Sequence, residues 1–146
     1  MNEAIQGEPA DFLNVRIIDV VADRLTARLD GELSYGTCAP ALELLTDAIE
    51  RGESKLVLDL SRLGFCDSAG LRLLVQLEEL TGKAGGWLRL AAPPQQMLQI
   101  LTVTNLHRFL ALYPSLHHAV LGTGRLSDET LEADTSLTKA EQKPPD

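Results

Sequence analysis

The stretch that decides the fold is residues 59–74, DLSRLGFCDSAGLRLL. It continues an apolar run that begins at Leu56, and a short apolar run bounded by polar residues is typical of a strand buried on both faces. From Leu71 onward, leucines recur at the spacing of one helix face. The stretch therefore predicts a buried strand, a short turn, and an amphipathic helix that begins at or beside Ser68.

Ser68 is placed where the backbone N–H groups of the expected helix are unpaired and its dipole is positive. A phosphate on the serine hydroxyl is electrostatically favoured at such a position. Asp67 and Ser68 are also residue types that cap helices, and a cap needs no further function. The residues alone leave both interpretations open, a modification site and a plain helix cap.

The composition limits the class of protein. The chain has 146 residues, a hydrophobic fraction of 45% and a formal net charge of −8, which suits one domain with its own core. The acidic balance argues against non-specific nucleic-acid binding, which needs clustered Lys and Arg. No apolar run approaches the roughly 20 residues of a membrane span, and the acidic N-terminus does not match a signal peptide. We expect a cytoplasmic protein that binds neither nucleic acid nor membrane.

Catalytic and metal chemistry find little support. A serine nucleophile with His107, His117 or His118 as its base is an alternative, but the Gly-x-Ser-x-Gly elbow is absent. Cys38 and Cys66 lack metal-ligand spacing, and a disulfide is not expected in the cytosol. Cys66 is a candidate redox sensor, although a small buried hydrophobe is the usual role. We expect no catalytic residue, no metal and no cofactor.

The patterns along the chain predict five strands and four helices. The strands are expected at residues 13–21, 25–30, 56–60, 87–92 and 109–113, and the helices at or after Thr37, Ser68, Pro94 and Pro114. Thr37 is expected to cap the first helix, with Pro40 in its first turn. The first two strands suit a hairpin, and strands separated by helices favour parallel pairing. The predicted fold is α/β, with a mixed, mostly parallel sheet of four or five strands and helices mainly on one face.

Both ends of the chain differ from the middle in composition. Residues 1–10 have little to bury and are expected to form a flexible lead-in to a domain at residues 11–121. Residues 122–146 contain no aromatic side chain, so burial there cannot offset the entropy cost of ordering. We expect a disordered acidic tail, with a brief helix near residues 128–133 as an exception.

The central stretch resembles the motif of the STAS domain family, whose bacterial single-domain members are anti-sigma factor antagonists. The resemblance extends over roughly residues 13–120, and Ser34 departs from it because the family has an acid there. Asn105 stands where the family has glycine, and asparagine also tolerates left-handed backbone angles. The residues that carry the resemblance are Asp59-Leu60-Ser61, Leu63, Phe65, Asp67-Ser68-Ala69-Gly70-Leu71, Gly31-Glu32-Leu33, Leu88-Arg89-Leu90 and Pro93-Pro94.

The resemblance implies the STAS fold, no enzymatic activity and partner switching in a stress response. It implies that Ser68 is phosphorylated by an anti-sigma factor that is also a serine kinase, and that a serine phosphatase removes the phosphate. The unphosphorylated protein would hold the kinase and so free a sigma factor for transcription. The expected partner-binding residues are Asp30, Glu32, Ser34, Ser61, Asp67, Ser68, Ala69, Gly70 and Arg72. The alternative is a STAS subunit or scaffold of a transporter or stress-signalling complex, without a phosphate cycle.

Overall fold

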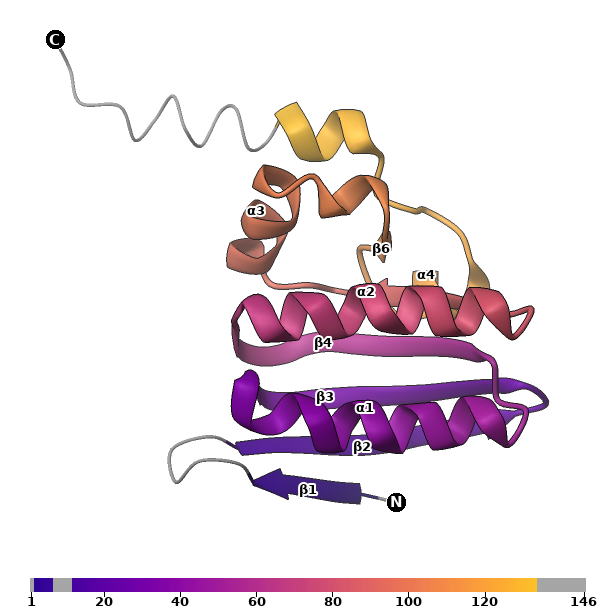
Figure 1. Ribbon diagram of the computed structural model, residues 1–146. Helices are drawn as coiled ribbons and strands as arrows, with labels where there is room; N and C mark the ends of the chain where they lie inside the picture. The colour runs from indigo at the N-terminus through magenta and orange to yellow at the C-terminus, as the bar shows by residue number, and fades with distance from the viewer. Residues whose placement is uncertain (1, 7–11, 134–146) are drawn as a thin grey trace, which may run out of the picture.

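Figure 1 shows the computed structural model, which describes residues 2–6 and 12–133. Within these residues one mixed sheet has six strands in the order β1-β2-β3-β4-β5-β6. The strands are β1 (Asn2–Gln6), β2 (Phe12–Val21), β3 (Arg24–Leu33), β4 (Lys55–Cys66), β5 (Trp87–Ala91) and β6 (Ala111–Tyr113). The strands from β1 to β3 pair antiparallel, and those from β3 to β6 pair parallel. The predicted α/β class with a mixed, mostly parallel sheet is confirmed.

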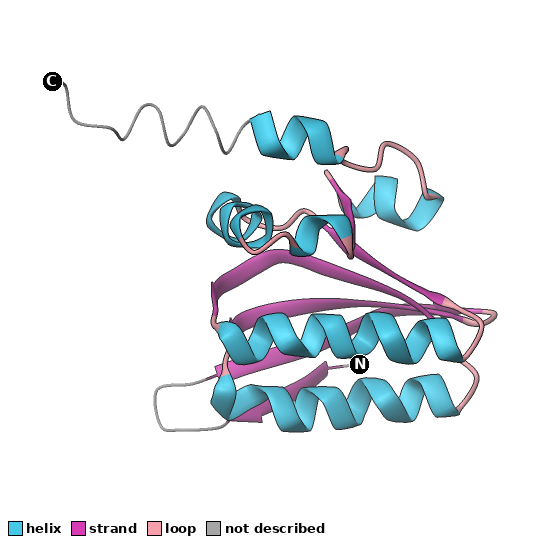
Figure 2. Ribbon diagram, turned by 45° about the horizontal axis from the view of Figure 1, so that its top comes forward, coloured by secondary structure: helices cyan, strands magenta, loops and turns pink. Residues whose placement is uncertain are grey.

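The two long helices lie side by side on one face of the sheet (Figures 1 and 2). The helices are α1 (Tyr35–Glu50), α2 (Ser68–Lys83), α3 (Gln95–Val103) and α4 (Leu116–Leu121), with a 3-10 turn η1 (Leu106–Arg108) after α3. The short helix α4 packs on the opposite face, against β4, β5 and β6. The sheet is therefore covered by α1 and α2 on one side and only partly covered on the other.

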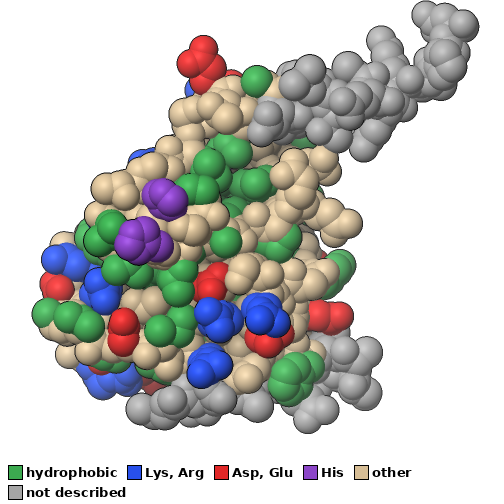
Figure 3. All heavy atoms as spheres, turned by 180° about the vertical axis from the view of Figure 1, so that it is seen from behind, with side chains coloured by type: hydrophobic (Ala, Val, Ile, Leu, Met, Phe, Trp, Pro, Cys, Tyr) green, Lys and Arg blue, Asp and Glu red, His purple; other side chains and the backbone are tan. Residues whose placement is uncertain are grey.

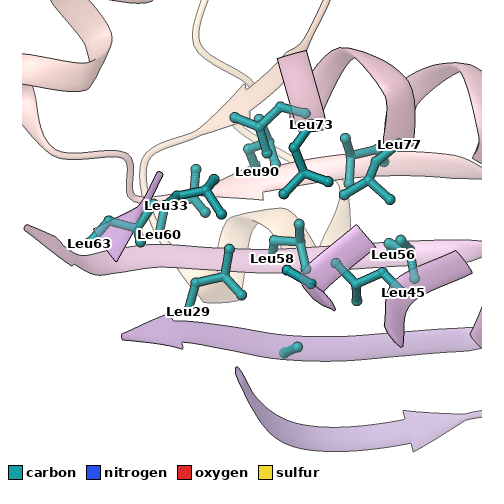
Figure 4. Packing of buried hydrophobic residues seen from close by; sticks show 14 of the residues in the cluster. Leu29, Leu33, Leu45, Leu56, Leu58, Leu60, Leu63, Leu73, Leu77 and Leu90 are labelled. Carbon is teal, nitrogen blue, oxygen red and sulfur yellow. The ribbon is translucent and has the colours of Figure 1, made fainter. Parts of the chain in front are cut away.

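Side chains along β4 point alternately to the two faces of the sheet. Its leucines Leu56, Leu58 and Leu60 belong to the main core beneath α1 and α2, whereas Val57 packs with Ala119 of α4. Figure 4 shows leucines of the sheet interlocking with leucines of the two helices. Because successive side chains of a strand point to opposite faces, a strand buried on both sides reads as a continuous apolar run. This is the run that the sequence displays.

The small helix α4 is held to the sheet by an arginine. The guanidinium of Arg89 on β5 lies 3.6 Å from the ring centroid of Trp87. One of its nitrogens donates to the carbonyl of Ala119 at 3.1 Å. The last carbonyls of a helix have no partner within it, so a cation at that end is favourable.

The start of α1 differs from the prediction. Ser34, not Thr37, is the N-cap residue. Thr37 is the third helical residue, and its hydroxyl oxygen accepts the Ser34 N–H at 3.1 Å. The two residues share one capping arrangement, so the sequence alone could not say which comes first. Pro40 consequently falls in the second turn of α1, where its missing N–H removes one helical hydrogen bond.

The N-terminal lead-in is also corrected. Residues 2–6 form β1, which pairs with β2 along the edge of the sheet. The residues carry no strong strand pattern, but an edge strand needs only main-chain hydrogen bonds to an exposed neighbouring strand. The rest of the expected lead-in lies outside the described residues.

The C-terminal segment is ordered further than predicted. The backbone N–H of Leu126 donates to the carbonyl of Leu112 at 2.8 Å, and Leu131 is 4% exposed. Glu132 accepts a hydrogen bond from Arg108 at 3.0 Å and lies 2.9 Å from the ring of the buried His107. Leu126, Leu131 and Glu132 thus hold residues 122–133 against the rest of the domain. This segment contains the expected helix at residues 128–133. The remainder of the predicted tail, residues 134–146, lies outside the described residues.

Candidate functional site

The candidate site lies where the C-terminal ends of β3 and β4 meet the N-terminal ends of α1 and α2. Each helix begins two residues after its strand ends, and both helices start at the same edge of the sheet (Figure 1, left). The N-terminus of a helix carries a partial positive charge and unpaired N–H groups. Two such ends next to one another favour a negative group at this edge.

Asp67 joins the two helix ends. It is the N-cap of α2, and its Oδ1 accepts the N–H of Gly70 at 3.0 Å. Its Oδ2 accepts the N–H of Tyr35, the first residue of α1, also at 3.0 Å. The capping role that the sequence left open therefore belongs to Asp67.

Ser68 is the first residue of α2 and is exposed. Within the described part of the chain, no hydrogen bond engages its hydroxyl group. A hydroxyl that faces solvent and has no structural contact is accessible to a modifying enzyme. The prediction that Ser68 begins a helix is confirmed, but the strand before it was predicted to end at residue 60 and instead continues to Cys66, so Asp67 alone separates β4 from α2.

A glycine brings α2 close to β3. A Cβ at Gly70 would lie 2.5 Å from the carbonyl oxygen of Leu33 and 2.7 Å from the Sγ of Cys66. Real Cβ atoms do not come this near to a backbone oxygen, so only glycine fits without movement of the helix. Gly70 is buried and therefore sets the position of the Ser68 turn.

The other predicted partner-binding residues divide into two groups. Glu32, Ala69 and Arg72 lie at the same edge as Ser68, and Arg72 is exposed one turn further along α2. Asp30 pairs in register with Arg62, three residues before the end of β3, and Ser61 lies five residues before the end of β4, so they lie about 10 Å and about 17 Å back along their strands. The structure does not bring Asp30 and Ser61 to Ser68.

Ser34 was expected to contact the partner in place of the family's acid. It is 4% exposed and serves as the N-cap residue of α1. A side chain this deeply buried has little surface to offer a partner. Its position is explained by the start of the helix.

Asp59, the first residue of the motif, is buried on the face opposite α1 and α2. Its Oδ2 accepts the Nε–H of Arg28 at 2.9 Å, and its Oδ1 accepts the N–H of Ser61 at 3.0 Å. Burial alone would raise the pKa of Asp59, but the hydrogen bonds from Ser61 and Arg28 outweigh it and hold the pKa below its ordinary value. Figure 3 shows this face, where basic and acidic side chains lie together. Asp59 therefore holds β3 to β4 and does not reach the Ser68 edge.

The cysteines near the site are protonated at neutral pH. Burial raises the pKa of Cys66 to about 12, with the charges of Cys38 and Asp67 adding to the effect. Burial likewise raises the pKa of Cys38 to about 11, assisted by Asp67. Because the thiolate is the reactive form, this environment argues against Cys66 as a redox sensor.

The histidines considered as catalytic bases are distributed over other elements. His107 lies in η1 beside Glu132, and the Nδ1 of His118 on α4 lies 2.6 Å from the Oγ of Ser115. The helix that carries His118 packs on the sheet face opposite α2. No group of three potential metal ligands occurs among the described residues. Nor do those residues include a helix with the length and apolar character of a membrane span.

Two apolar features at this edge were not anticipated. The side chain of Tyr35 is 84% exposed, and that of Phe65 is 51% exposed. Phe65 borders a pocket of about 170 Å³ between the end of β4 and α3. The sequence did contain a signal for the exposure of Tyr35. It is a large aromatic residue at the start of a helix, directly after the N-cap serine. The pocket depends on how α3 packs and leaves no local signal in the sequence.

Fold and motif together define a domain that presents a serine at the start of a helix. The chain belongs to the STAS domain family, whose model matches residues 13–119.

Two proteins similar to this chain are named as anti-sigma factor antagonists. A protein of Thermotoga neapolitana, a candidate anti-sigma factor antagonist described as a homolog of TM1081, is 28% identical over 72 residues. That match spans 49% of this chain and 64% of the relative's length. The crystal structure of an anti-sigma factor antagonist from Mycobacterium paratuberculosis superimposes with a TM-score of 0.62 and 27% identity, over 80% of this chain and 97% of that one.

A third relative shows the fold alone. The structure of the anti-sigma factor antagonist SpoIIAA in its unphosphorylated form has a TM-score of 0.63 at 20% identity, over 74% of this chain and 96% of that one. Bacillus SpoIIAA is also known in its phosphorylated form, which is 19% identical with a TM-score of 0.56, over 68% of this chain and 91% of that one.

Proposed function

We propose that this protein is a cytoplasmic anti-sigma factor antagonist, a binding module without enzymatic activity whose affinity is switched by phosphorylation of Ser68. Unmodified, it binds an anti-sigma factor that is also a serine kinase, and a sigma factor is released. A serine phosphatase restores the unmodified form. The observation that carries the proposal is the exposed hydroxyl of Ser68 at the convergence of two helix N-termini. The names of the relatives support the antagonist class.

Electrostatics supports such a switch. A phosphate at Ser68 adds about −1.5 to −2 charges at pH 7. In the free protein, the positive ends of α1 and α2 stabilise that charge. In a complex it would be buried beside Asp67, where like-charge repulsion and desolvation oppose binding. A penalty of about 2–3 kcal/mol would lower affinity roughly 30- to 150-fold.

The contact surface follows from the placement of the residues. We assign to it Glu32, Asp67, Ser68, Ala69 and Arg72, which lie at one edge. Gly70 acts from within, because it is buried and positions the turn. Ser34 acts in the same indirect way as the cap of α1. Asp30 and Ser61 are assigned to a separate part of the sheet.

The test is a capture experiment from host lysate with two full-length baits, Ser68→Ala and Ser68→Asp, read by mass spectrometry. The Ala bait should retain a kinase that the Asp bait loses. Thr123→Asp is the matched control, since it adds the same charge at an exposed position after α4 and should retain the kinase. Retention of one transporter ATPase by both Ser68 baits would instead support a transporter subunit, and capture of nothing by either bait would contradict the switch.

A further inference from the structure

Exposed apolar side chains lie on both sides of Ser68. On one side is Tyr35, whose backbone N–H is bonded to Asp67 and whose side chain is 84% exposed. On the other side lie Phe65, which is 51% exposed, and Ile100 of α3, which is 40% exposed. Single exposed hydrophobic residues are ordinary, but several of them at the edge that carries Ser68 suit an interaction surface.

The apolar pocket lies on the Phe65 side. Six of the residues that line it are Leu63, Phe65, Cys66, Pro94, Met97 and Ile100. Phe65 and Cys66 come directly before Asp67 in the chain, so the pocket wall leads into the cap of α2. Met97 is buried, with 4% of its surface exposed, and forms the inner side of the pocket. Any protein that covers Ser68 on this side meets the pocket mouth.

The volume and lining of the pocket indicate which kind of group it can hold. Its volume is about 170 Å³, and an apolar cavity of about 150 Å³ admits benzene. Sites for metabolites and cofactors are larger, about 300–1,000 Å³, and carry several placed polar groups. The uncharged lining fits one phenyl- or leucine-sized group rather than a nucleotide or other charged metabolite. A protein partner can supply a group of this kind as a single side chain.

We propose that this pocket receives one phenyl- or leucine-sized side chain of the protein partner that covers Ser68, and that Tyr35 inserts into that same partner as a second anchor. The inference rests on the proposed function, because it assigns the occupant to the partner recognised at Ser68. Aromatic residues and pockets near the centre of an interface carry most of its binding energy. The phosphate switch then acts between two apolar anchors, where water is excluded and a charge is most costly.

The first test asks whether the pocket admits a phenyl group, with toluene as the probe. The full-length protein is labelled at its methionine methyl groups, and Met1 serves as the reference for Met97. Toluene should shift the Met97 signal saturably. Gly64→Leu should abolish the shift, because Gly64 also lines the pocket and a Cβ there meets no described atom nearer than 3.9 Å. An unshifted Met97 signal in the unsubstituted protein, or an equal shift in both proteins, overturns the proposal.

The second test uses the partner captured by the Ser68→Ala bait. Ile100→Lys in that bait places a charge at the pocket mouth and should weaken binding at least about 30-fold, the loss typical of an interface hot spot. Tyr35→Ala should have a similar effect. Leu121→Lys is the matched control, since Leu121 is 59% exposed on α4, and it should bind like the parent bait. Unchanged binding by Ile100→Lys overturns the pocket assignment.

The two proposals fail in different ways. If Ser68→Asp releases the partner but Ile100→Lys does not, the pocket inference fails and the switch stands. If the Ser68→Ala bait retains no partner, both fail. If the full-length variant Leu137→Ser, outside the described residues, changes the Met97 signal in the absence of toluene, the chain's own C-terminal segment is the occupant and the inference is overturned.

Discussion

Asp59 and Asp67 stand eight residues apart in one motif and have opposite surroundings. Asp59 is 3% exposed and is bonded to Arg28 across neighbouring strands. Asp67 lies at the edge of the sheet, where its carboxylate accepts one N–H from each of two helices and borders an exposed serine. The comparison shows that the first half of the motif holds the sheet together, while the second half joins two helix ends beside the candidate site. Substitutions in the two halves should therefore have different consequences.

The largest loss of stability is expected for Asp59→Ala. The substitution leaves Arg28 without its partner and the N–H of Ser61 unbonded, and we expect a cost of about 2–4 kcal/mol. The partial exposure of Arg28 keeps the cost below that of a fully buried ion pair. Urea denaturation followed by circular dichroism measures it. Asp30→Ala, an exposed acid on β3, is the control and should change stability by less than about 0.5 kcal/mol.

Titration of the same carboxylate should have a smaller effect. The pKa of Asp59 is lower in the folded protein than in the unfolded chain, where it is near 4. Its charge-dependent stabilisation is therefore complete above about pH 4 and is lost as the pH falls through the lower, folded-state pKa. The stability difference between the wild type and Asp59→Asn should shrink below about pH 4. A difference that stays constant down to about pH 3 would contradict the account.

For Asp67→Ala we expect a loss of about 1–2 kcal/mol, because N-cap removal typically costs about 1 kcal/mol and a second N–H also loses its acceptor. Asp67→Asn should recover part of the loss, since asparagine caps as well but offers one acceptor oxygen. The same denaturation experiment distinguishes the three proteins. Equal stability of Asp67→Ala and the wild type would show that the cap does not hold the helix ends.

The smallest effect on stability is expected for Ser68→Ala. The hydroxyl makes no hydrogen bond with any described residue, so stability should change by less than about 0.5 kcal/mol. A cost near that of Asp67→Ala would mean that Ser68 is itself a structural cap. Asp67→Ala and Ser68→Ala together test whether Asp67 is the helix cap and Ser68 is free for modification.

The sequence best predicted the features that depend on residues close together in the chain. The beginning of α2 followed from a capping pair after an apolar run, and the left-handed backbone of Asn105, with φ of 66°, agreed with its residue type. The cap of α1 was placed three residues late, because Ser34 and Thr37 both suit the position. Edge strand β1 was missed because main-chain pairing holds it, and it carries no hydrophobic signal.

Features that join distant segments were beyond reach of the sequence. The Arg28–Asp59 pair links residues 31 positions apart and requires the register of β3 against β4. The attachment of Glu132 to His107 and Arg108 requires the C-terminal segment to reach η1. The pocket requires the packing of α3. At the site, the sequence predicted the position of Ser68. It did not predict that Asp30 and Ser61 lie away from Ser68.

The central claim is that Ser68 carries phosphate, and phosphopeptide mapping of the protein isolated from its host tests it most directly. Trypsin cleaves after Arg62 and Arg72 and releases residues 63–72, in which Ser68 is the sole hydroxyl residue. The neighbouring peptide, residues 56–62, has Ser61 as its sole hydroxyl residue and is a matched control. The account predicts phosphate on residues 63–72 and none on residues 56–62. Absence of phosphate from residues 63–72 in both growing and stressed cells would contradict it.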